Sequence, residues 1–594
     1  MGFALAACAA RPEPPAPLPA PVLIPDPYAV LPEVTVERLP PKVTVDSVLR
    51  TLSSREKIGQ LVFPWLLGDY SAFDGPALAS VLAAVDSFGV GGIIISIGSP
   101  LDVASKLNAL QRRSRLPLLI TADLEYGSGM RLVGGTAFPA VMAIGATGRE
   151  LDAYELGRVT ALEARAVGIH LTFSPVADVN NNPTNPIINT RSWGEDPAAV
   201  GRLIAAYVRG AEEHGLFTTA KHFPGHGDTG IDSHISVPVA TGCWDRLDSL
   251  ELEPFRAAIR AEVTAVMTAH IALPCLDGAD PVPATFNSRV MTEILRDSLG
   301  FTGLVVTDAL VMGAIVERFG PGESAVRAFL AGADLLIMPA DIGAAVAAMQ
   351  AALESGRISP ARLDASVRRV LTLKQRANLF TRRLVPLDEV PQTVGQQAFQ
   401  AIADDIAQRA LTLVARGPLD DFRSSRGRTA VISYAEETNL SIGNELLREL
   451  RAHGETVTEF RLYPASGSAS YDSARTAIAR AGRVVFASSV RPIAWRGHIA
   501  LPDSLAALIG ATAATRPTML VSFGSPYLLG QLPRFAGGYL IAWSNNLATE
   551  RATARALTGR APITGRLPIT LEAGHPIGSG IVVGGQTENR KGAR

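Results

Sequence analysis

Fourteen residues from Lys221 to His234, which read KHFPGHGDTGIDSH, hold three of the nine histidines of the chain, two aspartates and a lysine. Burying that many polar groups without partners costs several kilocalories per mole, and closely spaced glycines weaken both helices and strands. The segment is therefore predicted to be a loop, and loops commonly carry functional residues. Because imidazole and carboxylate groups transfer protons near neutral pH, the first chemistry to consider is acid–base catalysis.

A structural metal site is the alternative use of these side chains, since histidine and aspartate both ligate zinc. His222, His226 and His234 do not match the common ligand spacings, and the segment contains no cysteine. We therefore predict catalysis or substrate binding at this loop, with no metal and no cofactor.

The elements that position this loop follow a repeated pattern. From about residue 45, short runs rich in β-branched residues alternate with helical stretches such as Leu151–Val167, Pro197–His214 and Leu247–Ala261. Parallel strands need crossover connections, so repeated β–α units indicate a parallel sheet. Eight units predict a closed (β/α)₈ barrel of the TIM type over residues 41–385, with a doubly wound open sheet as the alternative. The eight runs are Gln60–Trp65, Val90–Ser96, Pro117–Asp123, His170–Asp178, Phe217–His222, Ala265–His270, Gly303–Asp308 and Ala333–Met338.

Polar side chains that can do chemistry stand at the carboxyl ends of these runs: Asp123, Asp178, Lys221, His222, His270 and Asp308. Two long irregular connections, Asn180–Trp193 and Pro224–Pro238, also follow predicted strands. In a barrel those ends and loops share the face on which active sites are built. The pattern therefore predicts that these polar residues meet there.

A second pattern begins after Leu373 and Pro386. A long helix over about Gln396–Leu413 precedes five further apolar runs, which predict a smaller α/β layered sandwich domain over residues 396–575. None of its segments offers a carboxylate or histidine in a comparable setting, so we expect it to support the barrel without supplying catalytic groups. The polar, glycine-rich residues 576–594 are predicted to form a flexible tail. The five runs are Thr429–Ser433, Val457–Phe460, Val484–Ser488, Met519–Ser522 and Gly538–Ala542.

The composition excludes several function classes. The chain has 594 residues, of which 47% are hydrophobic, and its 55 basic residues nearly balance its 56 acidic ones. This balance gives no electrostatic reason to expect nucleic acid as a partner. No apolar run approaches the roughly 20 residues of a membrane span. Three cysteines cannot form a disulfide framework, and we expect Cys243 and Cys275 to be ordinary buried thiols.

The N-terminal residues 1–40 resemble a leader and tether. Leu5-Ala-Ala-Cys8 is similar to the lipobox at which bacterial lipoproteins are cleaved and acylated, and the Pro-rich stretch Arg11–Pro32 follows it. The usual basic start and full apolar core are missing. We expect lipidation at Cys8 and a cell-envelope location, periplasmic or at the cell surface. A cytoplasmic enzyme with a disordered N-terminus is the alternative.

Asp308 and the histidine loop suggest one chemistry together. Asp308 ends a predicted strand, which places a carboxylate at the mouth of the barrel, whereas His234 lies in a loop two residues after Asp232. An Asp–His pair sets the imidazole tautomer and raises its pKa. A carboxylate nucleophile with a separate proton donor is the minimum for retaining glycoside hydrolysis, which normally uses two carboxylates. Metal-assisted hydrolysis remains an alternative with the same residue types.

These motifs resemble glycoside hydrolase family 3, specifically its β-N-acetylglucosaminidase branch. The resemblance covers about Val45 to Phe380 and, more weakly, the second domain, and its most specific motif is KHFPGHGDT followed by Asp232-Ser-His234. It implies that His234 is the general acid/base and that Asp232 is its dyad partner. It also implies that Asp308, in the Thr-Asp-Ala-Leu motif, is the nucleophile.

The resemblance further implies which residues bind the sugar. They are Asp123 at the end of the third run, Arg191 in the Arg-Ser-Trp-Gly-Glu-Asp-Pro motif, and the pair Lys221 and His222. The family run Asp-Gln-Glu-Gly-Gly-Arg reads Asp-Leu-Glu-Tyr-Gly-Ser here, so its glutamine and first arginine are absent. Two other charged residues of that region, Glu125 and Arg131, remain in register, and we expect Arg131 to bind substrate.

The activity implied is that of a retaining, exo-acting β-N-acetylglucosaminidase for peptidoglycan- or chitin-derived saccharides. The alternatives are a phosphorylase or β-glucosidase of the same fold and a non-catalytic saccharide-binding lipoprotein. A histidine acid/base, unlike a carboxylate, does not repel an incoming phosphate. The expected partner is a small saccharide, and the protein is expected to be a monomer whose only membrane contact is through Cys8.

Several residues near the motifs have two readings. Asp178 and His270 either contact substrate or serve the structure, and Trp193 either stacks on sugar or packs under its loop. We expect Asp228 to shape its loop through turn hydrogen bonds. Glu195 and Asp196 are expected to cap the helix that begins at Pro197.

Overall fold

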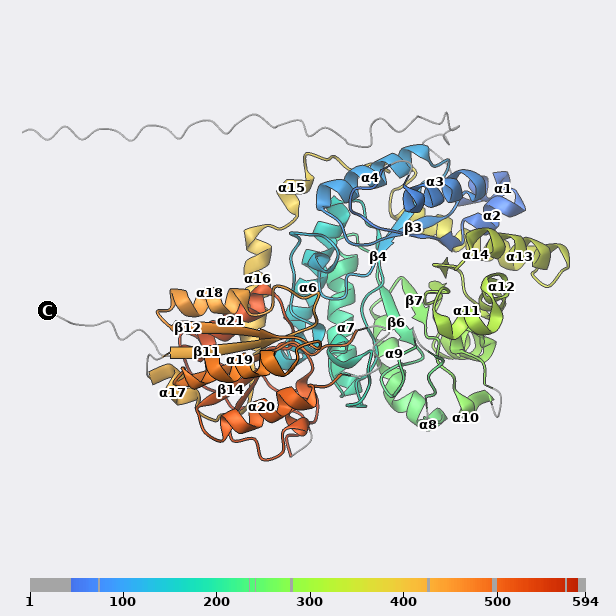
Figure 1. The fold of residues 1–594 in the computed structure, drawn as a ribbon. Coiled ribbons are helices and arrows are strands. Elements are labelled where there is room, and N and C mark those ends of the chain that lie inside the picture. The colour runs from blue at the N-terminus through green and yellow to red at the C-terminus, as the bar shows by residue number, and fades with distance from the viewer. Residues whose placement is uncertain are drawn as a thin grey trace, which may run out of the picture.

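The structure, a computed structural model, describes residues 44–72, 75–233, 236–240, 242–277, 281–424, 428–493, 499–571 and 574–585. Figure 1 shows two α/β domains side by side. Helices α15 (Val390–Thr393) and α16 (Gln397–Ala410) connect them. The chain therefore has a two-domain α/β fold. Leader residues 1–40, including Cys8, lie outside the described residues.

Strands of the first domain pair in parallel and fall into three sheets. Two isolated parallel bridges join these sheets: Leu171 pairs with Phe217, and Val306 pairs with Leu335. Each of the eight predicted runs overlaps at least one observed strand. The sheets contain β2 (Trp65–Leu66), β3 (Gly92–Ile95), β4 (Leu119–Ala122) and β5 (Leu171–Thr172); β6 (Thr219–Phe223), β7 (Ala265–Thr268) and β8 (Leu304–Val306); and β1 (Val62–Phe63) with β9 (Leu336–Ile337).

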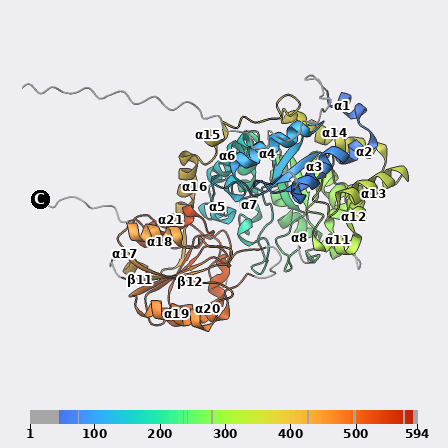
Figure 2. The ribbon, with the colours of Figure 1, turned by 45° about the horizontal axis from the view of Figure 1, so that its top comes forward.

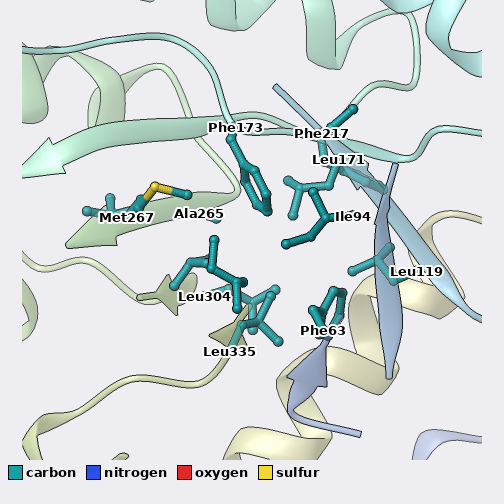
Figure 3. Packing of buried hydrophobic residues seen from close by; sticks show 14 of the residues in the cluster. Phe63, Ile94, Leu119, Leu171, Phe173, Phe217, Ala265, Met267, Leu304 and Leu335 are labelled. Atoms are coloured by element: carbon teal, nitrogen blue, oxygen red, sulfur yellow. The ribbon is translucent and has the colours of Figure 1, made fainter. Parts of the chain in front are cut away.

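Apolar side chains from successive strands fill the space between these sheets. Figure 3 shows Phe63, Leu119, Leu171, Leu304 and Leu335 among a group that point toward one another, and each of these five is at most 3% exposed. Strands buried on both sides must be apolar almost throughout, as the run Gly92–Ile95 is. Removing this apolar surface from water is the main favourable contribution to the folding of the domain.

Helices of the first domain cover the outside of the strands (Figures 1 and 2). Two predicted helices are present as α6 (Glu150–Ala166) and α7 (Pro197–Glu212). The third, predicted over Leu247–Ala261, is divided into a π-helical turn at Leu247–Glu251 and α9 (Glu253–Arg260). The other long helices are α3 (Pro76–Phe88), α4 (Pro100–Arg113), α12 (Pro321–Ala331), α13 (Ile342–Glu354) and α14 (Pro360–Arg376).

The second domain contains one six-stranded sheet in the order β10-β15-β14-β13-β11-β12. Only the β10–β15 pair is antiparallel. Alternate residues of β13 face opposite layers: Val484 and Phe486 pack with one apolar cluster, and Val485 and Ala487 pack with the other. This period of two is the side-chain periodicity of a strand covered on both faces. The strands are β10 (Thr412–Ala415), β11 (Arg428–Tyr434), β12 (Thr456–Leu462), β13 (Arg483–Ser488), β14 (Thr518–Ser522) and β15 (Gly538–Ile541).

Two predictions about this domain were wrong in detail. The helix predicted to reach Leu413 ends at Ala410, because residues from Thr412 onward pair with β15 as strand β10. The flexible tail predicted from residue 576 is hydrogen-bonded at least as far as Val583: Ile581 donates to the Leu413 carbonyl over 2.8 Å, and Val583 pairs with Ile563. Residues 586–594 lie outside the described residues.

Side-chain and backbone hydrogen bonds join the two domains. Asn546 Nδ2 donates to the Phe138 carbonyl over 2.8 Å, and Asn180 Nδ2 donates to the Tyr527 hydroxyl over 2.7 Å. Glu195 accepts a hydrogen bond of 2.7 Å from the Thr570 backbone N–H. Glu195 thus bonds to the second domain, and the expectation that it caps α7 is wrong. Asp196 does cap that helix, because its side chain accepts a hydrogen bond from the Ala199 N–H. None of the described helices is long and apolar enough to span a bilayer.

Candidate active site

A cavity of about 1020 Å³ lies between the two domains. Residues on or after β4, β6 and β8 line it from the first domain, and residues that follow β11, β13, β14 and β15 line it from the second domain. The carboxyl ends of parallel strands from both domains therefore open onto one space. All five residues predicted to converge there do line it: Asp123, Arg191, Lys221, His222 and Asp308.

Lys221 lies at the centre of a buried charge network. Its ammonium, in a residue only 3% exposed, is 2.8 Å from Asp123 Oδ1 and 2.8 Å from Glu125 Oε1. Burial lowers the pKa of Lys221, but the two carboxylates outweigh that effect and raise it above its usual value. Lys221 is therefore a charged donor held at a fixed point of the cavity.

Glu125 connects this lysine to Arg191. The Arg191 guanidinium makes two hydrogen bonds to the carboxylate, 2.9 Å from Nε to Oε2 and 2.7 Å from Nη2 to Oε1. Burial opposes ionisation of Glu125, but Arg191 and Lys221 hold its pKa well below the usual value. On the other side, Arg131 Nη2 is 3.5 Å from Asp123 Oδ2. The bidentate bond to Glu125 aligns Arg191, and sequence reasoning noted Glu125 without assigning it this role.

Asp308 presents a carboxylate to the cavity from the end of β8. Its Oδ1 accepts a 2.7 Å hydrogen bond from the Ala309 N–H, and the following segment is tied to β9 by the 3.0 Å bond from Leu310 N–H to the Ile337 carbonyl. Burial raises the pKa of Asp308, but His270, His222, the Ala309 N–H and Lys221 together lower it to about 2. The group is therefore ionised throughout the physiological pH range.

Asp178 positions the histidine loop from beneath. Its carboxylate is fully buried and accepts hydrogen bonds from His222 Nδ1 at 2.7 Å, from His222 N–H at 3.2 Å and from His226 N–H at 2.7 Å. Because Nδ1 is bonded to Asp178, only Nε2 of the His222 ring is left for other contacts. Asp178 does not line the cavity. Of its two predicted readings, the structure supports the structural one.

The loop is packed tightly around its glycines. A Cβ atom on Gly227 would lie 1.7 Å from the Val179 carbonyl oxygen, so no other residue fits there without movement of the backbone. His226 is only 2% exposed. Gly227 therefore allows close contact between this loop and the segment at Val179.

His226 lines the cavity, although sequence analysis considered it only as a metal ligand. Its Nδ1 lies 2.6 Å from Thr229 Oγ1, and its Nε2 is buried without a hydrogen-bond partner among the described residues. Burial lowers the pKa of His226 to about 4, so the ring is neutral at neutral pH. Its membership of the same motif as Lys221 was the only sequence signal for this position.

The acid/base end of the loop is only partly described. His234 lies outside the described residues, whereas Asp232 is 1% exposed and the adjacent Ser233 lines the cavity. Asp228, farther back in the loop, forms a 3.0 Å ion pair with Arg246. The loop therefore reaches the cavity one residue before the predicted general acid/base.

Two other predicted residues support the site without lining it. His270 is fully buried, with Nδ1 2.8 Å from Thr285 Oγ1 and Nε2 3.1 Å from the Ala309 carbonyl. Trp193 is 1% exposed and donates from Nε1 to the Val176 carbonyl over 3.0 Å, so it packs under its loop. Within the described part of the chain, no group of three or more His, Cys, Asp or Glu side chains is arranged to hold a metal ion.

The prediction that Cys243 and Cys275 are ordinary thiols was wrong. The two residues form a disulfide, with Cα atoms 5.2 Å apart, within the usual range. It joins the segment that follows the histidine loop to α10 (Pro274–Asp277), which follows β7. The two cysteines are 32 residues apart in the sequence, and this spacing does not predict that they pair. The cysteines come together only because β6 and β7 are neighbouring strands.

Comparisons with known proteins agree on one family. The model of the "Glycosyl hydrolase family 3 N terminal domain" matches residues 53–373. The "Beta-N-acetylglucosaminidase/beta-glucosidase" of Cellulomonas fimi is 30% identical over 545 residues, which cover 88% of this chain and 95% of that protein.

Two solved structures are similar over most of the chain. A "glycoside hydrolase family 3 beta-N-acetylglucosaminidase" from Paenibacillus sp. str. FPU-7 is 34% identical with a TM-score of 0.79, covering 87% of this chain and 99% of its own. A "Beta-glucoside phosphorylase BglX bound to 2FGlc" is 27% identical with a TM-score of 0.79, covering 89% and 96%.

Replacing Asp178 tests whether it positions the loop. Asp178→Asn places an amide N–H₂ against donors that now bond to a carboxylate, so we expect a loss of about 2 kcal/mol in the free energy of unfolding. Urea unfolding measures this loss. ¹⁵N chemical shifts of His222 should also show a reduced population of the Nδ1-protonated tautomer.

Asp228→Asn is the matched control for this experiment, because it changes a carboxylate of the same loop that pairs with the half-exposed Arg246. Its effect should stay within about 1 kcal/mol. Wild-type stability and an unchanged His222 tautomer in Asp178→Asn would contradict the assignment.

Proposed function

The chain belongs to glycoside hydrolase family 3, and from this premise we propose that it is a retaining, exo-acting β-N-acetylglucosaminidase for peptidoglycan- or chitin-derived saccharides. The observation that carries the proposal is the convergence of Asp308 with Asp123, Arg191, Lys221 and His222 in one cavity. An ionised carboxylate beside fixed hydrogen-bonding groups is the arrangement that glycosyl transfer to an enzyme needs. The similarity to the Paenibacillus enzyme supports the choice of sugar.

The proposed fold places this cavity on a closed barrel. The bridges Leu171–Phe217 and Val306–Leu335 connect the three parallel sheets, and β1 pairs with β9, the last strand of the domain. With β1 and β2 taken as one interrupted strand, these contacts support the proposal of a (β/α)₈ barrel of eight parallel strands. In such a barrel the carboxyl ends of the strands form the active-site face.

In the first step of the proposed reaction, Asp308 attacks the anomeric carbon while the glycosidic C–O bond breaks. His234 gives its proton to the departing oxygen, and Asp232 stabilises the imidazolium before that transfer. A covalent glycosyl-aspartate and a free leaving sugar result. Because Asp308 has a pKa of about 2, protonation of the nucleophile does not limit this step near neutral pH.

In the second step, His234 takes a proton from water as the water oxygen attacks the anomeric carbon. The bond to Asp308 breaks, which releases the sugar with its original anomeric configuration and restores the carboxylate. Throughout, Lys221 and Arg191 donate hydrogen bonds to sugar hydroxyls, and Asp123 accepts them. Arg131 and His222 complete the group of proposed sugar-binding residues.

A phosphorylase is the second candidate, because the chain is also similar to a protein described as a beta-glucoside phosphorylase. In that reaction phosphate would replace water in the second step, and the product would be a sugar 1-phosphate. Hydrolysis without phosphate, and no sugar 1-phosphate when phosphate is added, would decide for the hydrolase.

We also propose that Cys8 carries a lipid and that the protein is held at the cell envelope. Leu5-Ala-Ala-Cys8 supports this location, and so does the Cys243–Cys275 disulfide, because disulfides persist mainly in exported proteins. Cys8→Ser should move the protein from the membrane fraction to the soluble fraction after expression from its natural start. Equal amounts in the membrane fraction for both proteins would refute the anchor.

Turnover of two aryl substrates, with and without Asp308, tests the proposed activity. The wild-type protein should cleave an aryl N-acetyl-β-glucosaminide faster than the matching aryl β-glucoside. Asp308→Asn keeps the shape but removes the attacking charge, so its rate should fall about 10³-fold or more, while calorimetry should still detect binding of N-acetylglucosamine.

The matched control for the nucleophile is Asp297→Asn, which changes an exposed aspartate away from the cavity. It should cleave the aryl substrate at the wild-type rate. A wild-type rate in Asp308→Asn would refute the nucleophile, and absence of any turnover by the wild-type protein would refute the activity.

A variant of His234 separates the two chemical steps. An activated aryl group leaves without a proton, whereas a sugar needs one, so His234→Ala should slow cleavage of natural disaccharides far more than formation of the glycosyl-enzyme from aryl substrates. Azide needs no base and should restore part of the second step. Asp232→Ala should shift the pH optimum downward, because the imidazolium loses a neighbouring negative charge and its pKa falls.

Pre-steady-state and steady-state rates on both substrate types measure these effects. Equal slowing of aryl and natural substrates in His234→Ala, with no rescue by azide, would mean that the proton donor is another residue.

A further inference from the structure

Residues of the second domain form one side of the cavity. Asn439 follows β11, Arg491 follows β13, Gly524 follows β14 and Asn545 follows β15, and all four line the cavity. In open parallel sheets, ligands bind in the crevice outside the carboxyl ends of the strands. The second domain therefore offers a binding edge of its own toward the space that contains Asp308.

The backbone next to Arg491 is held in place on this edge. The backbone of the preceding residue, Val490, accepts a 2.6 Å hydrogen bond from Ser525 N–H, and Phe523 N–H donates to Ser488 over 2.8 Å. A Cβ atom on Gly524 would lie 2.1 Å from the Val490 carbonyl oxygen, so the two loops are in close contact. The chain is thus held at Val490, and the exposed Arg491 side chain begins at the margin of the cavity.

The charges that line the cavity are not balanced. Apart from histidines, the described lining residues comprise three carboxylates and four cations. Lys221 lies between Asp123 and Glu125, Arg191 pairs with Glu125, and Arg131 approaches Asp123.

Arg491 has no ion pair or hydrogen bond among the described residues. Arg491 acts on Tyr126, which also lines the cavity: burial raises the pKa of this phenol, and the positive charge of Arg491 opposes the rise. Of the three carboxylates that line the cavity, only Asp308 has no arginine or lysine within ion-pair distance among the described residues. Asp308 is the proposed nucleophile, so it is not available as a permanent partner of Arg491. An anion from the substrate would balance Arg491.

We propose that Arg491 binds a carboxylate on the leaving sugar of the substrate. This inference rests on the proposed function: the terminal N-acetylglucosaminyl unit carries no charge, so a charged group must belong to the part of the molecule that leaves. Arginine matches a carboxylate with two parallel hydrogen bonds. The preferred substrates are then saccharides whose second sugar carries a carboxylate, and neutral chitin-type saccharides are poorer ones.

A charged disaccharide and its neutral ester test this inference. The probes are N-acetylglucosaminyl-β-1,4-N-acetylmuramic acid, whose leaving sugar has a lactyl carboxylate, and the methyl ester of that carboxylate. Wild-type kcat/KM should be about tenfold higher for the acid than for the ester, because the ester cannot form the charge-assisted hydrogen bonds of a carboxylate with Arg491. Arg491→Gln should bring this ratio to about one.

Arg480→Gln is the matched control, because Arg480 is an exposed arginine of the same domain at the amino end of β13, away from the cavity. It should keep the wild-type ratio. Raised salt should also lower the wild-type ratio toward one, as expected for a charge contact.

Three results would overturn the inference: no preference for the acid in the wild-type protein, an unchanged ratio in Arg491→Gln, or an equal loss of ratio in Arg480→Gln. Phosphate stimulation of aryl turnover that disappears in Arg491→Gln would assign the anion site to a phosphate acceptor and would also overturn it. Turnover of the aryl N-acetyl-β-glucosaminide separates this failure from failure of the proposed activity, because that substrate has no carboxylate.

Discussion

The buried Lys221 ammonium, held between Asp123 and Glu125, is the interaction on which the candidate site depends. A buried charge is tolerated only when opposite charges and hydrogen bonds compensate its loss of water. Here the compensation links the ends of β4 and β6, because both carboxylates follow β4 and the lysine lies on β6. Glu125 also pairs with Arg191, so the loop between β5 and α7 is held next to Lys221. Removing Glu125 would leave Arg191 without its carboxylate partner and Lys221 with Asp123 alone.

The environment of each carboxylate explains how those in the cavity and beneath it differ in role. Asp123 and Glu125 face cations at ion-pair distance, and Asp178 is covered by the histidine loop that it holds. Asp308 instead faces the cavity, with its pKa lowered to about 2 by more distant positive groups and one backbone N–H. A carboxylate that is ionised but not paired is free to attack. The environment, more than the residue type, therefore distinguishes the proposed nucleophile from the carboxylates that bind or position.

Residues tied to a strand end were predictable, and those that depend on contacts between loops were not. Asp123, Lys221 and Asp308 could be placed together because parallel strands bring their carboxyl ends to one edge. The Glu125–Arg191 pair, the Cys243–Cys275 disulfide and the bond from Thr570 to Glu195 depend on how loops far apart in sequence meet. The second domain was expected only to support the first. Its contribution to the cavity depends on how the two domains are oriented, and the pattern of apolar residues in the sequence does not predict that orientation. The prediction that it supplies no catalytic group stays a prediction.

The most direct test of the account is to trap the glycosyl-enzyme with a fluorinated N-acetylglucosaminyl donor that slows the second step, and to map the label by peptide mass spectrometry. The account predicts one labelled peptide, with the sugar on Asp308, and no label in Asp308→Asn. A label on any other carboxylate, including Asp123 or Asp232, would contradict the assignment of the nucleophile and the reaction built on it.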